Sequence, residues 1–116
     1  MNYSDLTVWQ KAMQFVTELY KVTAAFPKEE KYGLVDQMRR AAVSVPSNIA
    51  EGHSRKAKAD FSKFLRIALG SLTELETQII ISKNLSYIDE SLTNKLLDTS
   101  LEIKKMLQGL LKSLNK

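Results

Sequence analysis

The sequence predicts an all-α protein that folds as an antiparallel, up-down-up-down four-helix bundle. Four segments repeat their apolar residues at spacings of three and four, which places them along one side of a helix. The connections between these segments are short, and short connections make consecutive helices antiparallel. The chain has only four glycines and two prolines in 116 residues, so turn-rich β architectures are disfavoured. We therefore expect a single domain that covers residues 1–116.

The first predicted helix covers about residues 5–25 and carries two adjacent apolar stripes. Ser4 or Asp5 is the expected N-cap, and Pro27 ends the helix because the residue before a proline is disfavoured in the α conformation. Two stripes make a wide apolar face, which is typical of a helix that packs against more than one neighbour. The stripes are Leu6, Trp9, Met13, Val16 and Tyr20, and Val8, Ala12, Phe15, Leu19, Val22 and Phe26.

The second predicted helix covers about residues 31–52 and contains Pro46. Proline removes a backbone hydrogen bond and clashes with the carbonyl four residues before it, so we expect a kink between Ala42 and Pro46. Two separate helices that meet there are the alternative. Small residues surround the proline and would let another helix approach closely. Gly52 is the expected residue just after the end of this helix.

The third predicted helix covers about residues 56–83, and the fourth runs from a cap at Asp89 or Ser91 to about Leu114. Gly109 lies inside the fourth helix, where a glycine costs about 1 kcal/mol relative to alanine, so we expect it to mark a close contact. The apolar stripes are Phe61, Phe64, Leu65, Ala68, Leu72, Leu75 and Ile79 in the third helix, and Leu92, Leu96, Ile103, Met106, Leu107, Leu110, Leu111 and Leu114 in the fourth.

The residue types of common catalytic and metal sites are scarce. The chain has one histidine, His53, no cysteine and no Glu-x-x-His motif, so a di-iron bundle is disfavoured. It has no glycine-rich phosphate loop, and His53 beside Ser54 is weak support for a hydrolytic triad. We expect no catalytic residue, no metal, no cofactor and no enzymatic activity.

The location of the protein is predicted by what the chain lacks. The first residues show no basic region followed by an apolar one, so we expect no signal peptide. The most apolar run, Ile79–Ile81, is too short to cross a membrane, and the absence of cysteine fits a reducing compartment. We therefore expect a cytoplasmic protein with no membrane partner.

Positive charge gathers in the middle of the chain. The formal net charge is +4, and residues 39–66 hold seven Lys and Arg against two acidic residues, Glu51 and Asp60. One interpretation is an ordinary solvated face, and the other is a surface that binds RNA or DNA phosphates. Aromatic residues are not interleaved among these basic residues, which favours contact with the backbone over recognition of single strands. The candidates are Arg39, Arg40, Arg55, Lys56, Lys58, Lys63 and Arg66.

Polar residues recur at helical spacing on the second predicted helix, among small apolar neighbours. They predict a buried or half-buried hydrogen-bond network that sets helix register or lines a subunit contact. Direct ligand binding is the alternative. The network candidates are Gln37, Arg40, Ser44, Asn48 and Glu51.

The chain has more apolar residues than a four-helix bundle would bury if each helix used only one face. They are the double stripe of the first helix and, in the third, Leu69, Ile80 and Ile81. A homo-oligomer would cover this surplus surface, since large exposed apolar patches are rare on monomers. Wide burial within the bundle is the alternative.

Several segments of the chain carry a family pattern. Residues 32–52 read YGLVDQMRRAAVSVPSNIAEG, and residues 64–76 read FLRIALGSLTELE. Together with LTVWQKA at 6–12, Phe26-Pro27 and Tyr87-Ile88, they resemble the four helix bundle protein family, also called ribosomal-RNA intervening-sequence proteins. The similarity covers nearly the whole chain in the same order.

The resemblance implies a four-helix bundle that assembles as a ring-like homopentamer and has no enzymatic activity. A related branch comprises accessory proteins of diversity-generating retroelements, which are basic pentamers that bind nucleic acid and a reverse transcriptase. A pentamer of a +4 chain would carry roughly +20. Two hypotheses follow. The protein is a homo-oligomer that binds RNA or DNA backbone through its basic residues, or it is a structural or adaptor protein that binds itself or a protein partner.

Overall fold

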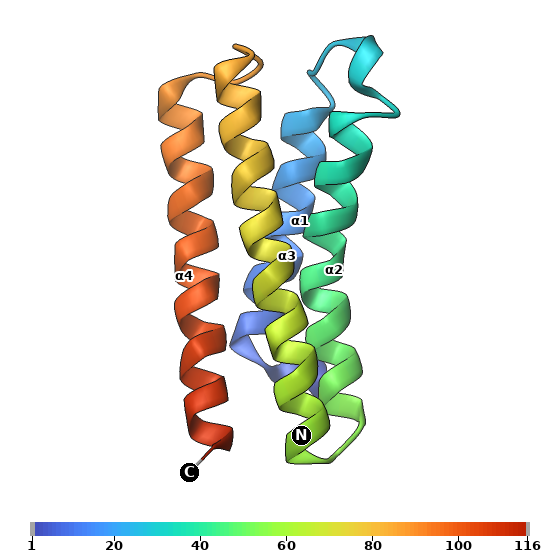
Figure 1. The fold of residues 1–116 in the computed structure, drawn as a ribbon, viewed down its shortest axis with the longest axis vertical. Coiled ribbons are helices and arrows are strands. Elements are labelled where there is room, and N and C mark those ends of the chain that lie inside the picture. Colours follow the sequence, from blue (N-terminus) through green and yellow to red (C-terminus); the bar gives the residue numbers. More distant parts are fainter. Residues whose placement is uncertain (1, 116) are drawn as a thin grey trace.

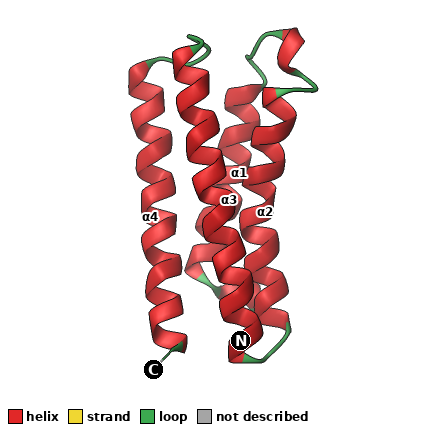
Figure 2. Ribbon diagram, in the orientation of Figure 1, coloured by secondary structure: helices red, strands yellow, loops and turns green. Residues whose placement is uncertain are grey.

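The computed structural model describes residues 2–115 and shows a four-helix bundle that measures 44 × 24 × 20 Å. Figure 2 shows helices and loops and, within these residues, no strand. The prediction of an all-α four-helix bundle is confirmed. The helices are the short 3₁₀ turns η1 (Tyr3–Asp5) and η2 (Lys28–Glu30), and the long helices α1 (Thr7–Thr23), α2 (Leu34–Ser54), α3 (Lys58–Asn84) and α4 (Glu90–Leu114).

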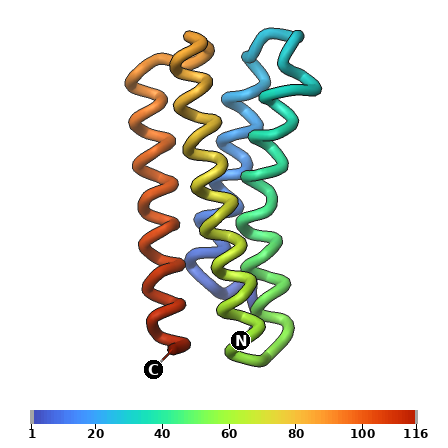
Figure 3. Tube along the Cα trace, viewed as in Figure 1, coloured from blue at the N-terminus to red at the C-terminus, as the bar shows by residue number. Residues whose placement is uncertain are grey.

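Consecutive helices run in opposite directions, as the colours along the chain show (Figures 1 and 3). Helices α2 and α3 are antiparallel, because residues later in α2 contact residues earlier in α3. The contacts Met38–Ser82, Ser44–Ser71 and Gly52–Phe61 show this order. The ion pairs between α1 and α4 show the same order in Lys11–Glu102 and Glu18–Lys95. The α2–α3 turn and the end of α4 therefore lie at one end of the bundle (Figure 3).

The core forms where the apolar stripes of the four helices meet. Burying one large aliphatic side chain contributes about 1.5–3 kcal/mol, so these residues supply most of the driving force for the bundle. The predicted stripes of all four helices contribute to it. The largest side chains with almost no exposed surface are Leu19, Met38, Ile49, Leu65, Leu72, Leu75, Ile79, Leu96, Ile103 and Leu107.

The chain enters α1 through a capped 3₁₀ turn, so the prediction of Ser4 or Asp5 as its N-cap is wrong. Asn2 caps η1, and its Oδ1 accepts a hydrogen bond from the Ser4 amide at 3.0 Å. Asp5 is the reciprocal member of this capping box, because its Oδ2 accepts from the Asn2 amide at 3.0 Å. Leu6 then occupies the N-cap position of α1 and makes no side-chain cap. The predicted cap at Asp89 is confirmed, since its Oδ1 accepts from the Leu92 amide at 2.7 Å.

Helix α2 continues through Pro46, so the alternative of two helices meeting there is wrong. The missing N–H of Pro46 deprives the carbonyl of Ala42 of its usual partner. The helix persists because α1 packs on one side of it and α3 on the other, and Pro46 is itself buried. The expected kink stays a prediction.

Gly52 lies inside α2 and not after its end, which corrects its predicted role as a terminating residue. The left-handed conformation occurs instead at Lys56, where φ is 60°. Gly52 is buried against Phe61 and Phe64 of α3. The expected close contact at Gly109 is also wrong, because that residue is exposed and a Cβ there would meet no atom within 4 Å.

No helix within residues 2–115 combines the length and the apolar character needed to span a membrane.

Candidate functional site

The structure divides the seven predicted basic residues into two groups at different levels of the bundle. Arg39 and Arg40 lie in the first half of α2, whereas the other five lie between the end of α2 and the third turn of α3. Arg40 and Arg55 are separated by fifteen residues, which is about 22 Å along a helix. Arg39 and Arg40 are also engaged by groups of the chain itself, so we treat the two groups separately.

Arg39 ties α2 to the end of α1. Its Nε donates to Thr23 Oγ1 at 2.9 Å, and its Nη2 donates to the Tyr20 carbonyl at 3.1 Å. The guanidinium carbon lies 4.3 Å from the centroid of the Tyr20 ring, in cation–π geometry. The arginine thus adds a side-chain donor to a carbonyl in the last turn of α1 that already accepts from the Ala24 amide. Two of its five N–H donors and one face of its guanidinium group are therefore engaged within the chain.

Arg40 forms a surface ion pair within α2. Its Nε lies 2.9 Å from Asp36 Oδ2, and the arginine side chain is 78% exposed. Exposed pairs of this type contribute little to stability. The neighbouring carboxylate also offsets the positive charge at this point of the surface.

The other five basic residues form what we call the basic turn cluster: Arg55, Lys56, Lys58, Lys63 and Arg66. All five are exposed. Arg55 pairs with Glu51 at 3.4 Å. The remaining four make no ion pair with any residue in the 2–115 range. Their charge is therefore available to an external anion.

Two phenylalanines and the histidine lie among these basic residues, so the expectation that no aromatic residue is interleaved with them is wrong. The Arg55 guanidinium carbon lies 5.3 Å from the Phe64 ring centroid, and Lys63 Nζ lies 5.7 Å from it. His53 and Phe61 pack edge to face at 5.5 Å between centroids. Spacing alone assigned both phenylalanines to the core stripe, yet both are only half-buried at the seam with α2.

The predicted polar network forms in part, and it includes a residue that the sequence did not indicate. Ser44 Oγ lies 2.8 Å from Ser71 Oγ on α3, and Asn48 Nδ2 donates to Ser44 Oγ at 2.9 Å and to the Ser44 carbonyl at 2.7 Å. Ser71 was missed because only the packing of α3 on α2 identifies it as a partner. The network joins α2 to α3; its role in helix register stays a prediction.

Three predicted network members lie outside this group. Arg40 pairs with Asp36, and Glu51 pairs with Arg55. The side chain of Gln37 makes no hydrogen bond to another residue in the described part of the chain, and it is exposed. The five residues therefore do not form one site, which argues against the alternative that all five bind a ligand together.

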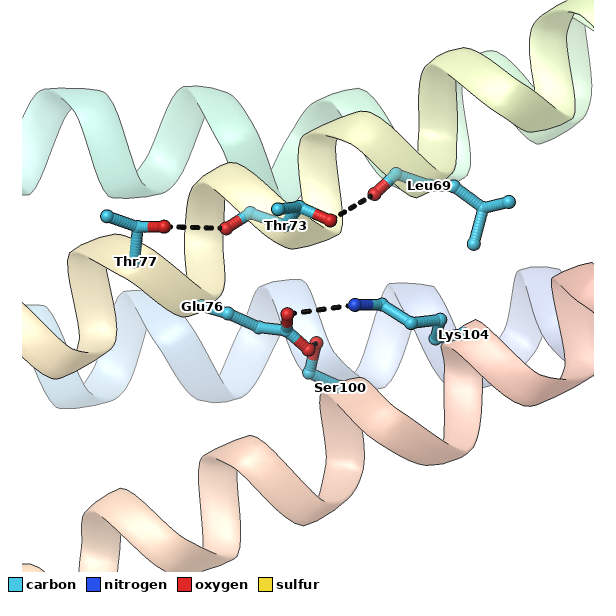
Figure 4. Close-up of polar contacts among 6 residues, drawn as sticks. All are labelled: Leu69, Thr73, Glu76, Thr77, Ser100 and Lys104. Atoms are coloured by element: carbon cyan, nitrogen blue, oxygen red, sulfur yellow. Dashed lines mark hydrogen bonds and ion pairs between the residues drawn. The ribbon is translucent and has the colours of Figure 1, made fainter.

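A second polar contact joins α3 to α4 (Figure 4). Glu76 accepts from Ser100 Oγ at 2.9 Å and from Lys104 Nζ at 2.9 Å. The charged side chains are only 22% and 23% exposed. Figure 4 also shows Thr73 and Thr77, whose hydroxyls donate to carbonyls one turn earlier in α3. The Glu76 contact is structural, because it satisfies half-buried polar groups between two helices.

Tyr87 connects the α3–α4 loop to η2. Its hydroxyl donates to Glu30 Oε2 at 2.7 Å. This hydrogen bond raises the pKa of Tyr87 above its ordinary value, and burial and the negative charges of Glu30 and Glu29 raise it further. The contact links the two loops at the end of the bundle opposite the basic turn cluster.

The surplus apolar surface of α1 lines a groove shared with α2. Met13 is 42% exposed and Val43 is 39% exposed, and the groove has a volume of about 330 Å³. We call it the α1–α2 groove; it is lined by Tyr3, Trp9, Met13, Val16, Val43, Pro46, Ser47 and Ala50. On α3, Ile80 and Ile81 are exposed, whereas Leu69 packs against the core.

Within residues 2–115, no three His, Asp or Glu side chains lie close enough together to hold a metal ion.

Comparison with known proteins identifies the family. The family model described as 23S rRNA-intervening sequence protein matches residues 4–109. The chain belongs to this family. The resemblance seen in the sequence is thereby confirmed, and the match spans all four helices apart from the last residues of α4.

A solved structure shares the fold of this 23S rRNA-intervening sequence protein. It is a protein of unknown function from the S23 ribosomal protein family of Bacteroides thetaiotaomicron, with a TM-score of 0.82 and 26% sequence identity. The similarity covers 91% of this chain and 99% of that one. No curated protein matches the chain. The family match and the solved structure therefore support the fold but assign no activity.

Proposed function

We propose that this protein is a non-catalytic, homo-oligomeric bundle that binds the backbone of RNA or DNA through the basic turn cluster. The observation that carries the proposal is the set of exposed cations at one end of the bundle, four of which have no carboxylate partner among the described residues. Lys and Arg side chains that neutralise phosphates release counterions, which drives binding without sequence recognition. Arg39 is not part of this surface, because its donors hold α1.

Self-association would strengthen this surface. One chain has a net charge of only +4, but each copy in an oligomer would present its own cluster, and clustered charge raises the local potential. The α1–α2 groove supports self-association, since it leaves Met13 and Val43 exposed beside the buried Pro46. The family resemblance suggests a ring-like pentamer, which would carry five copies of the cluster.

The test measures affinity for an RNA and for duplex DNA between about 50 and 200 mM salt. We expect binding that weakens as salt rises. The variant Arg55→Glu/Lys58→Glu/Arg66→Glu should lose nucleic acid but stay assembled. The matched control is Lys21→Glu/Lys28→Glu/Lys83→Glu, which changes three exposed lysines by the same charge away from the cluster. Absence of binding at low salt, or binding that is independent of salt, would refute the proposal.

The α1–α2 groove also favours a second candidate function, that of a structural or adaptor protein with a protein partner. Apolar grooves of this kind accept helices or extended segments of other proteins. A reverse transcriptase is the partner expected if the chain belongs to the retroelement branch. A pull-down that returns protein without nucleic acid, together with wild-type behaviour of the triple Glu variant, would favour this candidate over nucleic-acid binding.

A further inference from the structure

A hollow of about 320 Å³ opens at the α2–α3 turn, next to the basic turn cluster. It is formed by the last turn of α2, the first turn of α3 and the end of α4. Its volume lies at the lower end of the range of about 300–1,000 Å³ found for small-ligand sites. The residues that line it are His53, Lys56, Ala57, Lys58, Phe61 and Leu114.

Two aromatic rings form one wall of the hollow. The planes of His53 and Phe61 are inclined at 87°, with their centroids 5.5 Å apart. Both rings line the hollow, and stacked and edge-to-face contacts with a planar group are both favourable between π systems. Phe61 packs closely on Gly52, and the glycine leaves room for the ring, because a Cβ there would lie only 3.1 Å from Phe61 Cδ1.

Two lysines line the hollow beside these rings. Lys56 and Lys58 are exposed and have no ion pair within residues 2–115. The left-handed backbone of Lys56 lies in the turn between the helices, and Lys58 begins α3 directly after it, so both lysines border the hollow. The hollow thus combines flat ring surface with two free ammonium groups. A nucleotide has the matching parts, a planar base and an anionic phosphate.

We propose that this hollow takes one unpaired nucleotide of a single-stranded nucleic acid, with the base against His53 and Phe61 and the phosphate beside Lys56 and Lys58. The inference rests on the proposed function and adds a preference to it. Bases in a duplex are stacked on each other and cannot reach a side-chain ring, whereas bases in a single strand can. The hollow therefore discriminates between single strands and duplexes, which the basic turn cluster alone does not.

The experiment compares three probes of about twelve nucleotides by fluorescence anisotropy in low salt. They are an RNA that cannot pair with itself, the same RNA as a duplex, and a strand of equal length made of abasic sugar–phosphate units. We expect the base-bearing strand to bind roughly tenfold tighter than the abasic strand, since stacking of one base contributes a factor of about 5 to 150. Adenosine monophosphate should compete only weakly, because it lacks the neighbouring phosphates.

Two sets of variants separate the base from the phosphate. Phe61→Leu and, separately, His53→Gln remove a ring and should abolish the preference for bases while binding to the abasic strand persists. Lys56→Gln/Lys58→Gln should weaken both strands, and the matched control Lys21→Gln/Lys28→Gln should weaken neither. If Phe61→Leu fails to fold, His53→Gln still tests the stacking.

The outcomes distinguish this inference from the proposed function. Equal affinity for all three probes would overturn the inference and leave the proposed function standing. Binding of adenosine monophosphate as tight as that of the strand would also overturn it, since the site would then take free nucleotides. Absence of binding to every probe at low salt would overturn both.

Discussion

Gly52 and Phe64 mark the closest approach of α2 to α3: a Cβ added to Gly52 would lie 2.6 Å from the Cβ of Phe64. Carbon atoms do not approach this closely, so any larger residue would force the two helices apart. The contact lies within the basic turn cluster, because Lys63 and Arg66 flank Phe64 in α3 and Arg55 lies against its ring. It therefore controls the position of Phe61 and Phe64, which border that cluster and the adjoining hollow.

We predict that Gly52→Ala destabilises the protein. Alanine in a helix is intrinsically better than glycine by about 0.5–1 kcal/mol, but overpacking at a tight helix contact costs about 1–3 kcal/mol. The second effect is larger, so the free energy of unfolding should fall by about 1 kcal/mol or more. Urea denaturation followed by circular dichroism measures it.

The matched control is Gly109→Ala, and Gly70→Ala is a second one. A Cβ added at either residue would meet no atom within 4 Å, so the only effect left is the higher helix propensity of alanine. Both variants should be more stable than the wild type by about 0.5–1 kcal/mol. A Gly52→Ala variant that gains stability like these two would show that α2 and α3 do not meet as described.

We predict that Arg39 and Arg66 have separable roles. Arg39→Lys keeps the charge but loses the bonds to Thr23 and the Tyr20 carbonyl, so stability should fall by about 1 kcal/mol with little change in nucleic-acid affinity. Arg66→Gln removes an exposed charge of the basic turn cluster, so nucleic-acid affinity should fall while the free energy of unfolding stays unchanged. The reverse pattern in either variant would contradict these assignments.

We predict measurable coupling between Glu76 and Lys104. The pair is largely shielded from water and Glu76 also accepts from Ser100, so a double-mutant cycle with alanine should give about 1 kcal/mol of interaction free energy. The exposed pair Asp36–Arg40 is the comparison, and its cycle should give about 0.3–0.5 kcal/mol. Equal coupling in the two cycles would show that the shielding between α3 and α4 has no energetic effect.

We predict a loss of stability at alkaline pH that depends on Tyr87. Its pKa is raised in the folded state, chiefly by the hydrogen bond to Glu30. A group of this kind stabilises the fold below its unfolded pKa of about 10, and the contribution disappears as pH rises through the higher folded value. The wild type should therefore be more stable than Tyr87→Phe at pH 8, and the difference should shrink above about pH 10.

The control for this prediction is Tyr32→Phe, since Tyr32 is 87% exposed. Urea denaturation at several pH values measures both variants. A difference between the wild type and Tyr87→Phe that stays constant from pH 8 to beyond the ordinary tyrosine range of about 10 would contradict the proposed contact.

Local spacing was sufficient for the helices and for most of the core. Apolar residues at intervals of three and four must lie on one side of a helix whatever that helix packs against. Leu65, Leu72 and Ile79 illustrate this, since each was expected in the core and each is fully buried. The caps were less predictable, because Asn2 and Asp5 form a turn before α1 that competes with a cap on α1 itself.

The candidate site required tertiary contacts. The sequence grouped Arg39 with Arg66 because both are basic and central in the chain, but the bundle places Arg39 against α1 and Arg66 on an open face. It grouped Gln37 with Ser44 and omitted Ser71, because a hydrogen-bond partner on another helix cannot be read from spacing along one helix.

The sequence by itself therefore determined the four helices, the faces that they bury, the family and the net charge. Each of these follows from residue types at short spacing along the chain. Only the tertiary structure decided which basic residues remain free, which aromatic rings lie beside them and why residue 52 is glycine. These depend on distances between α2 and α3, and such distances arise when residues far apart in the chain pack together.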